Sequence, residues 1–222
     1  MSDEATSNVS KPARKQQQRS IVTQQKLLDA AIEAFSENGF KGTSTRDIAE
    51  RAGVHHPLIT YHFKNKEQLW RAAADRVFRE FNVSLAQTMA DVGDLDPKSR
   101  AAEFVRTYVR HSHDNPALHK IILQESSHPS DRLDWLVDRH VKPLFNEAVK
   151  SLRELQDMGV APQGDPALLF NMIRVSAGGL LALAAEIRGT SNIDLRTEAA
   201  LDQLADMIIR CFLPGDVAST GT

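Results

Sequence analysis

The sequence predicts an all-α protein of about nine helices, arranged as a small N-terminal and a larger C-terminal helical domain. Apolar residues recur at intervals of three and four along most of the chain, which is the period of an amphipathic helix. No segment shows the sustained apolar–polar alternation of a half-buried strand. Cap signals separate the helices, because Ser44, Asn65, Asp96 and Asp165 each precede a helical stripe.

The elements follow in order along the first 81 residues. A stripe from Leu27 to Phe35 predicts a helix that ends at Gly39, with Phe40 packing back on its last turn. Ser44 and Asp47 form a capping-box-like start of a short helix, which Gly53 stops after Ala52. A second helix of about two turns fits before Asn65. Asn65 then opens a longer helix that runs to Phe81.

The remainder is also helical, with Asp-Pro pairs at two helix starts. Helices are expected from Asp96 to Asn115, around Leu118–Ile122, from Ser130 to Leu155, from Asp165 to Arg188 and from Leu195 to Phe212. Pro143 should kink the third of these by removing one hydrogen bond.

Composition and charge narrow the class of protein. The chain has 222 residues, 41% of them hydrophobic, and its one cysteine, Cys211, excludes an internal disulfide and indicates a reducing compartment. The first twenty residues lack the apolar core of a signal peptide, and the longest uncharged apolar run, Val175 to Ala185, is shorter than the roughly 20 residues of a membrane span. We expect a cytoplasmic protein with no membrane association.

Charge is uneven along the chain. Residues 11–70 carry ten Lys/Arg against six Asp/Glu, whereas residues 71–222 carry seventeen against twenty-one. A basic N-terminal part fits an anionic partner, and chance gives the same small excess. Residues 1–19 are expected to be a disordered basic arm, which either contacts DNA or is a solvated tail, and residues 214–222 a flexible tail. The basic residues of the arm are Lys11, Arg14, Lys15 and Arg19.

Two short helices joined by a glycine turn are the parts of a helix-turn-helix, here about residues 44–63. In that motif the second helix lies in the major groove of DNA. The inner faces would be formed by Ile48, Ala49, Ala52, Val54, Ile59 and Phe63, which leaves His55, His56, Leu58, Thr60 and Tyr61 facing outward.

The stretch from Gly42 to Trp70, "GTSTRDIAERAGVHHPLITYHFKNKEQLW", closely resembles the DNA-binding domain of the TetR family of transcriptional repressors. The resemblance covers about 50 residues, including the preceding "LLDAAIEAFSENGF", and implies a DNA-binding domain at residues 20–80 and a regulatory and dimerisation domain at residues 81–213. The matching motifs are Gly39-Phe40, Thr43, Thr45, Ile48-Ala49, Ala52-Gly53-Val54, Tyr61-His62-Phe63 and Lys66 to Leu69.

Carried over by position, the resemblance implies a DNA-binding surface. Helix N-termini and Lys are natural phosphate ligands, and Arg can read guanine through two hydrogen bonds. The chain departs from the family at three positions, where His55, Pro57 and Thr60 replace a common Ser, a small residue and Tyr. The implied DNA-binding residues are Thr45, Arg46, His55, His56, Pro57, Leu58, Thr60, Tyr61 and Lys66.

The adjacent histidines raise the question of a metal site. His55 and His56 would point about 100° apart on a helix, so they cannot face one metal together. His111 and His113 also lie on different faces. No ligand set with a recognised metal spacing is present, and we expect neither metal nor cofactor. Our hypothesis is that His55 and His56 contact the DNA; the alternative is a solvated pair with no energetic role.

The C-terminal helices carry large apolar and polarisable residues that are core by default. If they surround a ligand pocket, it should be mostly apolar with a few polar anchors, and the effector a small apolar or aromatic molecule. The candidates are Phe104, Tyr108, His111, Ile122, Trp135, His140, Phe145 and Met172, with Phe170 beside them.

Small residues along "RVSAGGLLALAAEI" allow close helix approach, which suits a homodimer interface, and packing inside one subunit is the alternative. In the family, the last two helices of each subunit form a four-helix bundle. The expected interface residues are Val175, Ala177, Gly178, Leu181, Ala182, Ala185, Leu201, Leu204, Ala205, Ile208 and Phe212.

Together these patterns predict a dimer that binds a palindromic operator in double-stranded DNA, represses transcription and is released by a small molecule. One alternative is a regulator or activator without an effector, whose C-terminal domain only dimerises. Another is a helical enzyme or carrier with an appended DNA-binding domain. The sequence has no nucleophile elbow, phosphate-binding loop or zinc set, so we expect no enzymatic activity.

Overall fold

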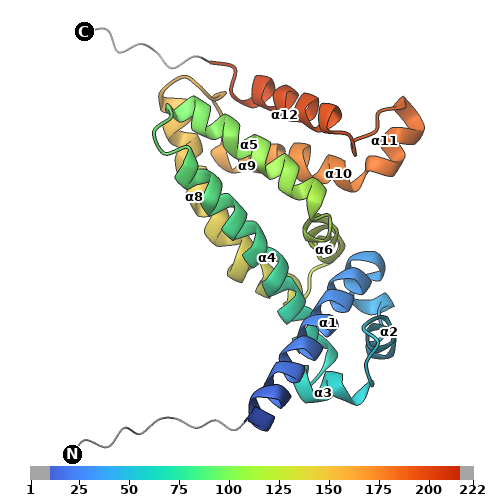
Figure 1. The fold of residues 1–222 in the computed structure, drawn as a ribbon. Helices are drawn as coiled ribbons and strands as arrows, with labels where there is room; N and C mark the ends of the chain where they lie inside the picture. The colour runs from blue at the N-terminus through green and yellow to red at the C-terminus, as the bar shows by residue number, and fades with distance from the viewer. Residues whose placement is uncertain (1–10, 216–222) are drawn as a thin grey trace, which may run out of the picture. The chain divides into compact units, whose positions relative to one another are not determined.

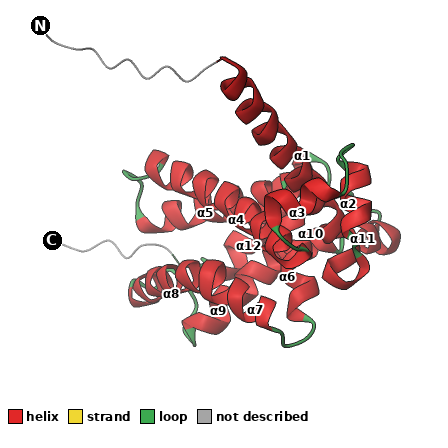
Figure 2. Ribbon diagram, turned by 90° about the horizontal axis from the view of Figure 1, so that it is seen from below, coloured by secondary structure: helices red, strands yellow, loops and turns green. Residues whose placement is uncertain are grey.

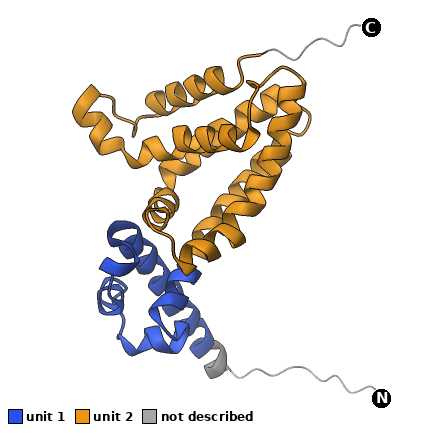
Figure 3. Ribbon diagram, turned by 180° about the vertical axis from the view of Figure 1, so that it is seen from behind, with its two compact units in different colours: residues 1–73 blue, residues 74–222 orange. Residues whose placement is uncertain are grey.

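The structure, a computed structural model, describes residues 11–215. Helices joined by loops form this part of the chain, which contains no strand (Figure 1, Figure 2). The chain divides into two compact units, residues 1–73 and residues 74–222 (Figure 3). The predicted all-α class is confirmed.

The first unit contains α1 (Lys11–Gly42), α2 (Thr45–Arg51), α3 (Pro57–Phe63) and the beginning of α4 (Lys66–Asp91). Residues 11–19, expected to be disordered, form the first turns of α1 instead. Lys, Arg and Gln are good helix formers, so the helix that starts its apolar stripe at Leu27 extends backward through them. Residues 1–10 lie outside the described part of the chain.

The core of the first unit joins all four of these helices. Leu27 and Phe35 of α1 are fully buried, as are Ile48 of α2 and Leu69 of α4, and Ile59 of α3 is almost so. These positions follow the predicted apolar stripes, so burial of the stripes holds the four helices together.

Gly39 bends α1 near its end, as expected of a C-terminal glycine. Its φ of 69° lies in the left-handed region, where a side chain would be strained. The Phe40 ring then stacks on Phe35, with centroids 6.1 Å apart. The Thr43 hydroxyl donates to the Ala34 and Gly39 carbonyls at 3.0 and 2.8 Å, which fixes the loop into α2.

The unit boundary falls inside α4, at residues 73/74 rather than at the expected 80/81. The reason is visible in the packing of α4 after this point. The Phe78 ring stacks on His140 with centroids 4.5 Å apart, and Phe81 meets Tyr108 edge to face at 5.5 Å. Most of α4 is therefore an element of the second unit.

The second unit continues with α5 (Pro97–Asp114), α6 (Ala117–Ser126), α7 (Asp131–Leu136), α8 (Lys142–Asp157), α9 (Pro166–Arg174), α10 (Leu180–Ala182), α11 (Ala184–Ser191) and α12 (Glu198–Phe212). Two π turns, Val137–Val141 and Val175–Gly179, join α7 to α8 and α9 to α10. With each π turn counted as part of the helix it joins, the described residues form ten helices rather than about nine.

The expected caps are present. Asp96 accepts hydrogen bonds from the backbone of Lys98 and Ser99 at 3.0 and 3.1 Å, and Asp165 accepts one from Ala167 at 2.8 Å. Each Asp precedes a proline in the first turn of its helix, a position where a missing N–H leaves no hydrogen bond broken.

Pro143 produces a local widening of the predicted long helix. The Lys142 N–H donates to the Val137 carbonyl five residues earlier, which is the hydrogen bond of a π turn. Pro143 then lies in the first turn of α8, where its missing N–H is tolerated. A π turn before Pro143 is therefore found at the position where the sequence predicted a kink.

The predicted helix from Asp165 to Arg188 breaks at Leu183, which accounts for the additional helix. Pro166–Ala182 and Ala184–Ser191 are bent by 76°. Within residues 11–215, no single helix is long and apolar enough to cross a membrane, although this bent pair meets the same criteria of length and composition.

A buried histidine joins three elements of the second unit. His119 of α6 is 4% exposed, and its Nε2 lies 2.7 Å from the Ser112 hydroxyl of α5. Gly178 of the second π turn packs directly on the ring, since an added Cβ there would lie 2.0 Å from Cε1 of His119. Burial, with Arg174 and His111 nearby, lowers the pKa of His119 to about 4.

Candidate functional sites

The first short helix of the motif begins with the predicted cap. The Ser44 hydroxyl accepts a hydrogen bond from the Asp47 backbone at 3.0 Å, which satisfies one free N–H of the first turn. The Asp47 carboxylate instead pairs with Arg51, at 3.3 Å. Arg51 also reaches Glu37 of α1 at 2.7 Å, so α2 is held to α1 by charge as well as by its apolar face.

The turn between α2 and α3 is a Schellman motif. The Gly53 N–H donates to the Glu50 carbonyl and the Val54 N–H to the Ala49 carbonyl, both at 3.0 Å. Gly53 has a φ of 63°, which a side chain would disfavour. The glycine that stops α2 therefore also sets the direction in which α3 begins.

The second short helix separates its buried face from its exposed face as predicted. Ile59 and Phe63 are buried, and the Tyr61 side chain is 75% exposed. Pro57 occupies the first turn, where no N–H is needed. The other residues of the predicted reading surface are exposed (His55, His56, Pro57 and Thr60), except for Leu58, which is half-buried.

A hydrogen bond between the two motif helices was not predicted. The Thr45 hydroxyl lies 2.9 Å from Nε2 of His56, which joins the start of α2 to the start of α3. The sequence gives no direct signal for this contact, because the two residues are eleven positions apart on different helices. His56 thus has a positioning role in the structure in addition to its proposed contact with DNA.

Lys66 lies at the start of α4, with its ammonium 4.4 Å from the centre of the Phe40 ring. Phe40 in turn meets Trp70 edge to face at 6.5 Å. This cation–π contact restricts the position of the Lys66 ammonium to the face of the Phe40 ring. Arg46, the remaining predicted DNA contact, is exposed on α2.

The basic arm is partly described. Lys15 and Arg19 are exposed on the first turns of α1. The side chains of Lys11 and Arg14 lie outside the described part of the structure.

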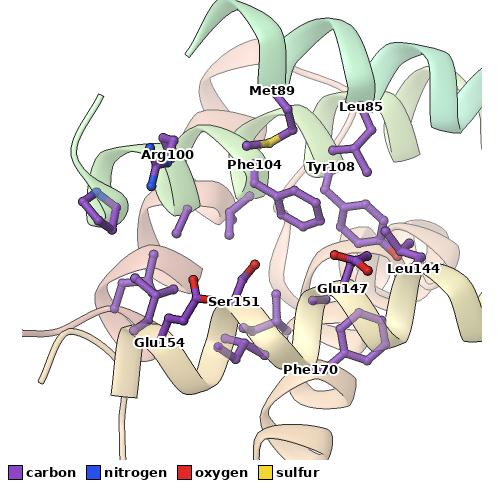
Figure 4. Close-up of a pocket in the computed structure, with 18 of the residues that line it drawn as sticks. Leu85, Met89, Arg100, Phe104, Tyr108, Leu144, Glu147, Ser151, Glu154 and Phe170 are labelled. Atoms are coloured by element: carbon purple, nitrogen blue, oxygen red, sulfur yellow. The ribbon is translucent and has the colours of Figure 1, made fainter. Parts of the chain in front are cut away.

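The second unit contains a mostly apolar cavity of about 340 Å³, within the size range of small-molecule sites (Figure 4). Phe104 and Tyr108 of the predicted pocket line it, as does Phe170, which the sequence placed beside them. The lining residues are Leu85 and Met89 of α4; Pro97, Arg100, Ala101, Phe104, Val105 and Tyr108 of α5; Leu144, Glu147, Ala148, Ser151, Leu152, Glu154 and Leu155 of α8; Phe170, Ile173 and Arg174 of α9; and Met158 and Leu213.

The other predicted pocket residues lie elsewhere. His111 is buried beside Phe81, with ring centroids 5.1 Å apart. Trp135 meets His140 edge to face at 5.4 Å, so both rings belong to the packing around Phe78.

Three further members of the predicted set also do not line the cavity. Ile122 is buried on α6, and Phe145 packs on Phe170 with centroids 5.3 Å apart. Met172 is 55% exposed. A helical stripe shows that a residue faces inward or outward but not which neighbour it meets.

The polar residues of the cavity were not predicted from the sequence. Glu147, Ser151 and Glu154 follow one another on α8 at spacings of four and three, so they share one side of the helix. This polar run beside an apolar stripe was the available signal. Arg100 and Arg174 contribute the positive charge of the lining.

The predicted dimer interface is largely internal to the subunit. The apolar stripe of α12 faces α5, and Arg106–Asp206 and Arg110–Asp202 ion pairs of 2.8 and 3.1 Å join the two helices. Buried residues of the predicted set are Ala177, Gly178, Leu201, Leu204, Ala205 and Ile208; Leu181, Ala182 and Phe212 are half-buried, and only Val175 and Ala185 are exposed.

Comparison with known proteins agrees with the motif. Residues 27–80 match the family described as bacterial regulatory proteins, tetR family. The transcriptional regulator RutR of Escherichia coli K12 is 26% identical over 189 residues, which cover 85% of this chain and 88% of RutR. The transcriptional repressor NicS of Pseudomonas putida KT2440 is 29% identical over 143 residues, 63% of this chain and 64% of NicS.

The fold agrees as well. The crystal structure of AibR in complex with isovaleryl coenzyme A and operator DNA superposes with a TM-score of 0.70 at 16% identity, covering 87% of this chain and all of that one. The capped helices, the glycine turn and the exposed face of α3 thus occur in a chain with the family's domain and fold. Residues 27–80 form a DNA-binding domain of the TetR family, and the relatives support a helix-turn-helix transcriptional regulator of that family.

Proposed function

We propose that this regulator is a repressor that binds a palindromic operator as a dimer and is released by a small molecule. The DNA-binding part of the proposal rests on the separation of α3 into a buried face and an exposed face. Ile59 and Phe63 hold the helix in the core, while Tyr61 and His55 are exposed and available to bases.

The proposed DNA contacts fall into two groups. Thr45, Arg46 and Lys66 lie at the starts of α2 and α4, where positive charge and free N–H groups suit phosphate. The second group lies around α3 and would meet base edges: the exposed His55, His56, Pro57, Thr60 and Tyr61, and the half-buried Leu58.

The proposed dimer face differs from the one expected from the sequence. Leu168, Met172 and Val175 are 65%, 55% and 55% exposed and follow one another at spacings of four and three. Met207 of α12 is 51% exposed. Soluble oligomers bury such side chains against a symmetric copy. Met172→Glu should therefore give a monomer by mass measurement, whereas Leu123→Glu, at an exposed apolar residue of α6, should leave the dimer intact.

The cavity supports the ligand-responsive form of the proposal. Its wall includes Leu85 and Met89 of α4, the same helix that starts in the DNA-binding unit at Lys66. A ligand that favours a different position of α4 would change the spacing of the two recognition helices and lower DNA affinity by reciprocal coupling. NicS is a repressor and AibR was crystallised with operator DNA and a coenzyme A ester, which motivates the same arrangement here.

The competing proposal is a regulator without an effector, whose second unit only dimerises. A solid second unit would favour it, and the cavity favours the ligand-responsive form instead. Activation in place of repression uses the same DNA-binding surface. Either form acts where the chromosome is, in the cytoplasm.

The decisive experiment is a footprint on the DNA that flanks the protein's own gene, with the mass of the protein measured in the same buffer. Protection of an inverted repeat by dimers is expected. Salt-sensitive binding without a protected site would contradict the proposed operator, because phosphate contacts alone give that behaviour.

A further inference from the structure

Polar groups in the cavity lie on opposite walls. Figure 4 shows Arg100, Phe104 and Tyr108 along α5, facing Glu147, Ser151 and Glu154 along α8. Arg174 of α9 also lines the cavity. The charges of these groups, and the partners they already have, indicate what kind of ligand would fit.

Arg174 is the unusual member of the lining. Its Nε is buried with no hydrogen-bond partner, and its one hydrogen bond to a side chain runs from Nη2 to Asn171 at 3.3 Å. No ion pair joins it to a carboxylate within residues 11–215. Arg174 is half-buried and its buried Nε lacks an acceptor, so a negative group that accepts from this nitrogen would be preferred.

Tyr108 supplies a second donor close to Arg174. Burial raises the pKa of Tyr108 far above its ordinary value, and the nearby charge of Arg174 only partly opposes this. The phenol therefore keeps its proton over the physiological range and can donate a hydrogen bond. A carboxylate accepts from both a guanidinium and a phenol, whereas an ammonium accepts from neither.

The remaining charged groups of the lining are already satisfied by water or backbone. Glu147 and Glu154 are exposed, so water solvates their carboxylates. Arg100 donates to the Gly93 carbonyl at 3.3 Å. The arginines of the cavity are thus half-buried, whereas the carboxylates on α8 are exposed.

We propose that the effector is an amphipathic monocarboxylate whose head group pairs with Arg174 and the Tyr108 hydroxyl. Its apolar body lies against Phe104, Met89 and Leu152. The exposed Glu147 and Glu154 disfavour further negative charge, so the free acid binds better than its coenzyme A ester. This inference rests on the proposed function, because it names the ligand class of the same cavity.

The test uses calorimetry on the full-length protein with four probes: decanoate, 1-decanol, decyltrimethylammonium and decanoyl coenzyme A. We expect decanoate to bind at least tenfold more tightly than each of the others. Arg174→Met should abolish the preference for decanoate over decanol, and Arg174→Lys should retain part of it. Retained binding of decanol by Arg174→Met shows that the cavity is still formed.

Tightest binding of decyltrimethylammonium, lost in Glu147→Gln, would overturn the proposal in favour of a cationic ligand. Tightest binding of decanoyl coenzyme A, or no binding of any probe, would also overturn it. Failure of the proposed function is distinguishable: decanoate would then bind through Arg174 without reducing binding to the footprinted DNA.

Discussion

Asp75 of α4 and His140 of the first π turn are in direct contact, with Asp75 Oδ1 2.8 Å from His140 Nε2. The same carboxylate accepts from Arg139 at 2.6 Å, and Phe78 stacks on the imidazole. These contacts attach α4 to the junction of α7 and α8. His140, which the sequence placed among the ligand anchors, is therefore part of the packing that holds α4 in the second unit.

Asp75→Asn should lower the pKa of His140 further. Burial already lowers this pKa, and the Asp75 carboxylate opposes that effect by favouring the imidazolium. Removing the charge leaves burial unopposed. An NMR titration of the His140 ring measures the shift. Asp138→Asn is the matched control, because Asp138 pairs with Lys142 on the exposed side of the same turn; an equal shift there would contradict the assignment.

The free energy of unfolding should fall as the pH drops from about 6.5 to about 4, because of His119. The unfolded chain binds a proton at this residue near pH 6.5 and the folded chain only near pH 4, so acid favours unfolding across that window. The contribution is about 3 kcal/mol, present above pH 6.5 and lost by pH 4. Urea titrations of the wild type and His119→Gln measure it. Equal pH dependence of the two proteins would rule it out.

Gly178→Ala should destabilise the second unit by about 1–3 kcal/mol, since the added methyl group would overlap the buried His119 ring. Gly189→Ala in α11 is the control. Beyond the adjoining backbone of its own helix, no atom lies within 4 Å of its Cβ position, so the substitution should be neutral or stabilising by up to about 1 kcal/mol. Thermal unfolding compares the two. A Gly178→Ala protein as stable as Gly189→Ala would show that α6 and the π turn are not packed as described.

Ser44→Ala should destabilise the DNA-binding unit by about 1 kcal/mol, because the Asp47 N–H loses its acceptor at the start of α2. Ser44→Asp should restore the stability, since a carboxylate caps equally well. Hydrogen exchange of the α2 amides detects the local effect. Unchanged exchange in the alanine variant would mean that the cap does not stabilise the helix.

His56→Ala should reduce the ratio of affinities for operator and scrambled DNA about tenfold, within the range for loss of one base contact. Because His56 also contacts Thr45, the loss of that hydrogen bond needs its own control. Thr45→Val removes the bond and a proposed phosphate contact, so it should weaken binding to both DNAs equally. An unchanged ratio in His56→Ala would remove His56 from base readout.

The helix-turn-helix could be predicted almost completely from the sequence. Ser44, Gly53 and Asn65 act on backbone groups within five positions of themselves, and the structure confirms each of them. Local hydrogen bonds of this kind leave a signature in the order of residues. The periodicity of apolar residues likewise predicted which residues of α3 face the core. The first unit has a single small core, so the apolar stripe of α3 can be buried only there.

The sequence predicted the helices of the second unit but not how these helices pack on one another. Leu201 and Leu204 gave α12 an apolar stripe, and the stripe packs on α5 of the same subunit. The two π turns were not predicted either. Pro143 lies just after the first of them, and Gly178 of the second packs on the His119 ring, and this contact depends on the tertiary structure.

The sequence by itself determined the all-α class, the position of the DNA-binding motif and the exposed face of α3, because each depends on neighbours along the chain. Only the tertiary structure decided which residues line the cavity, that Arg174 lacks a countercharge within it, and which apolar residues remain exposed for a partner. Those properties depend on how far-separated helices are juxtaposed, and an apolar stripe fits many partners equally well until the whole unit has packed.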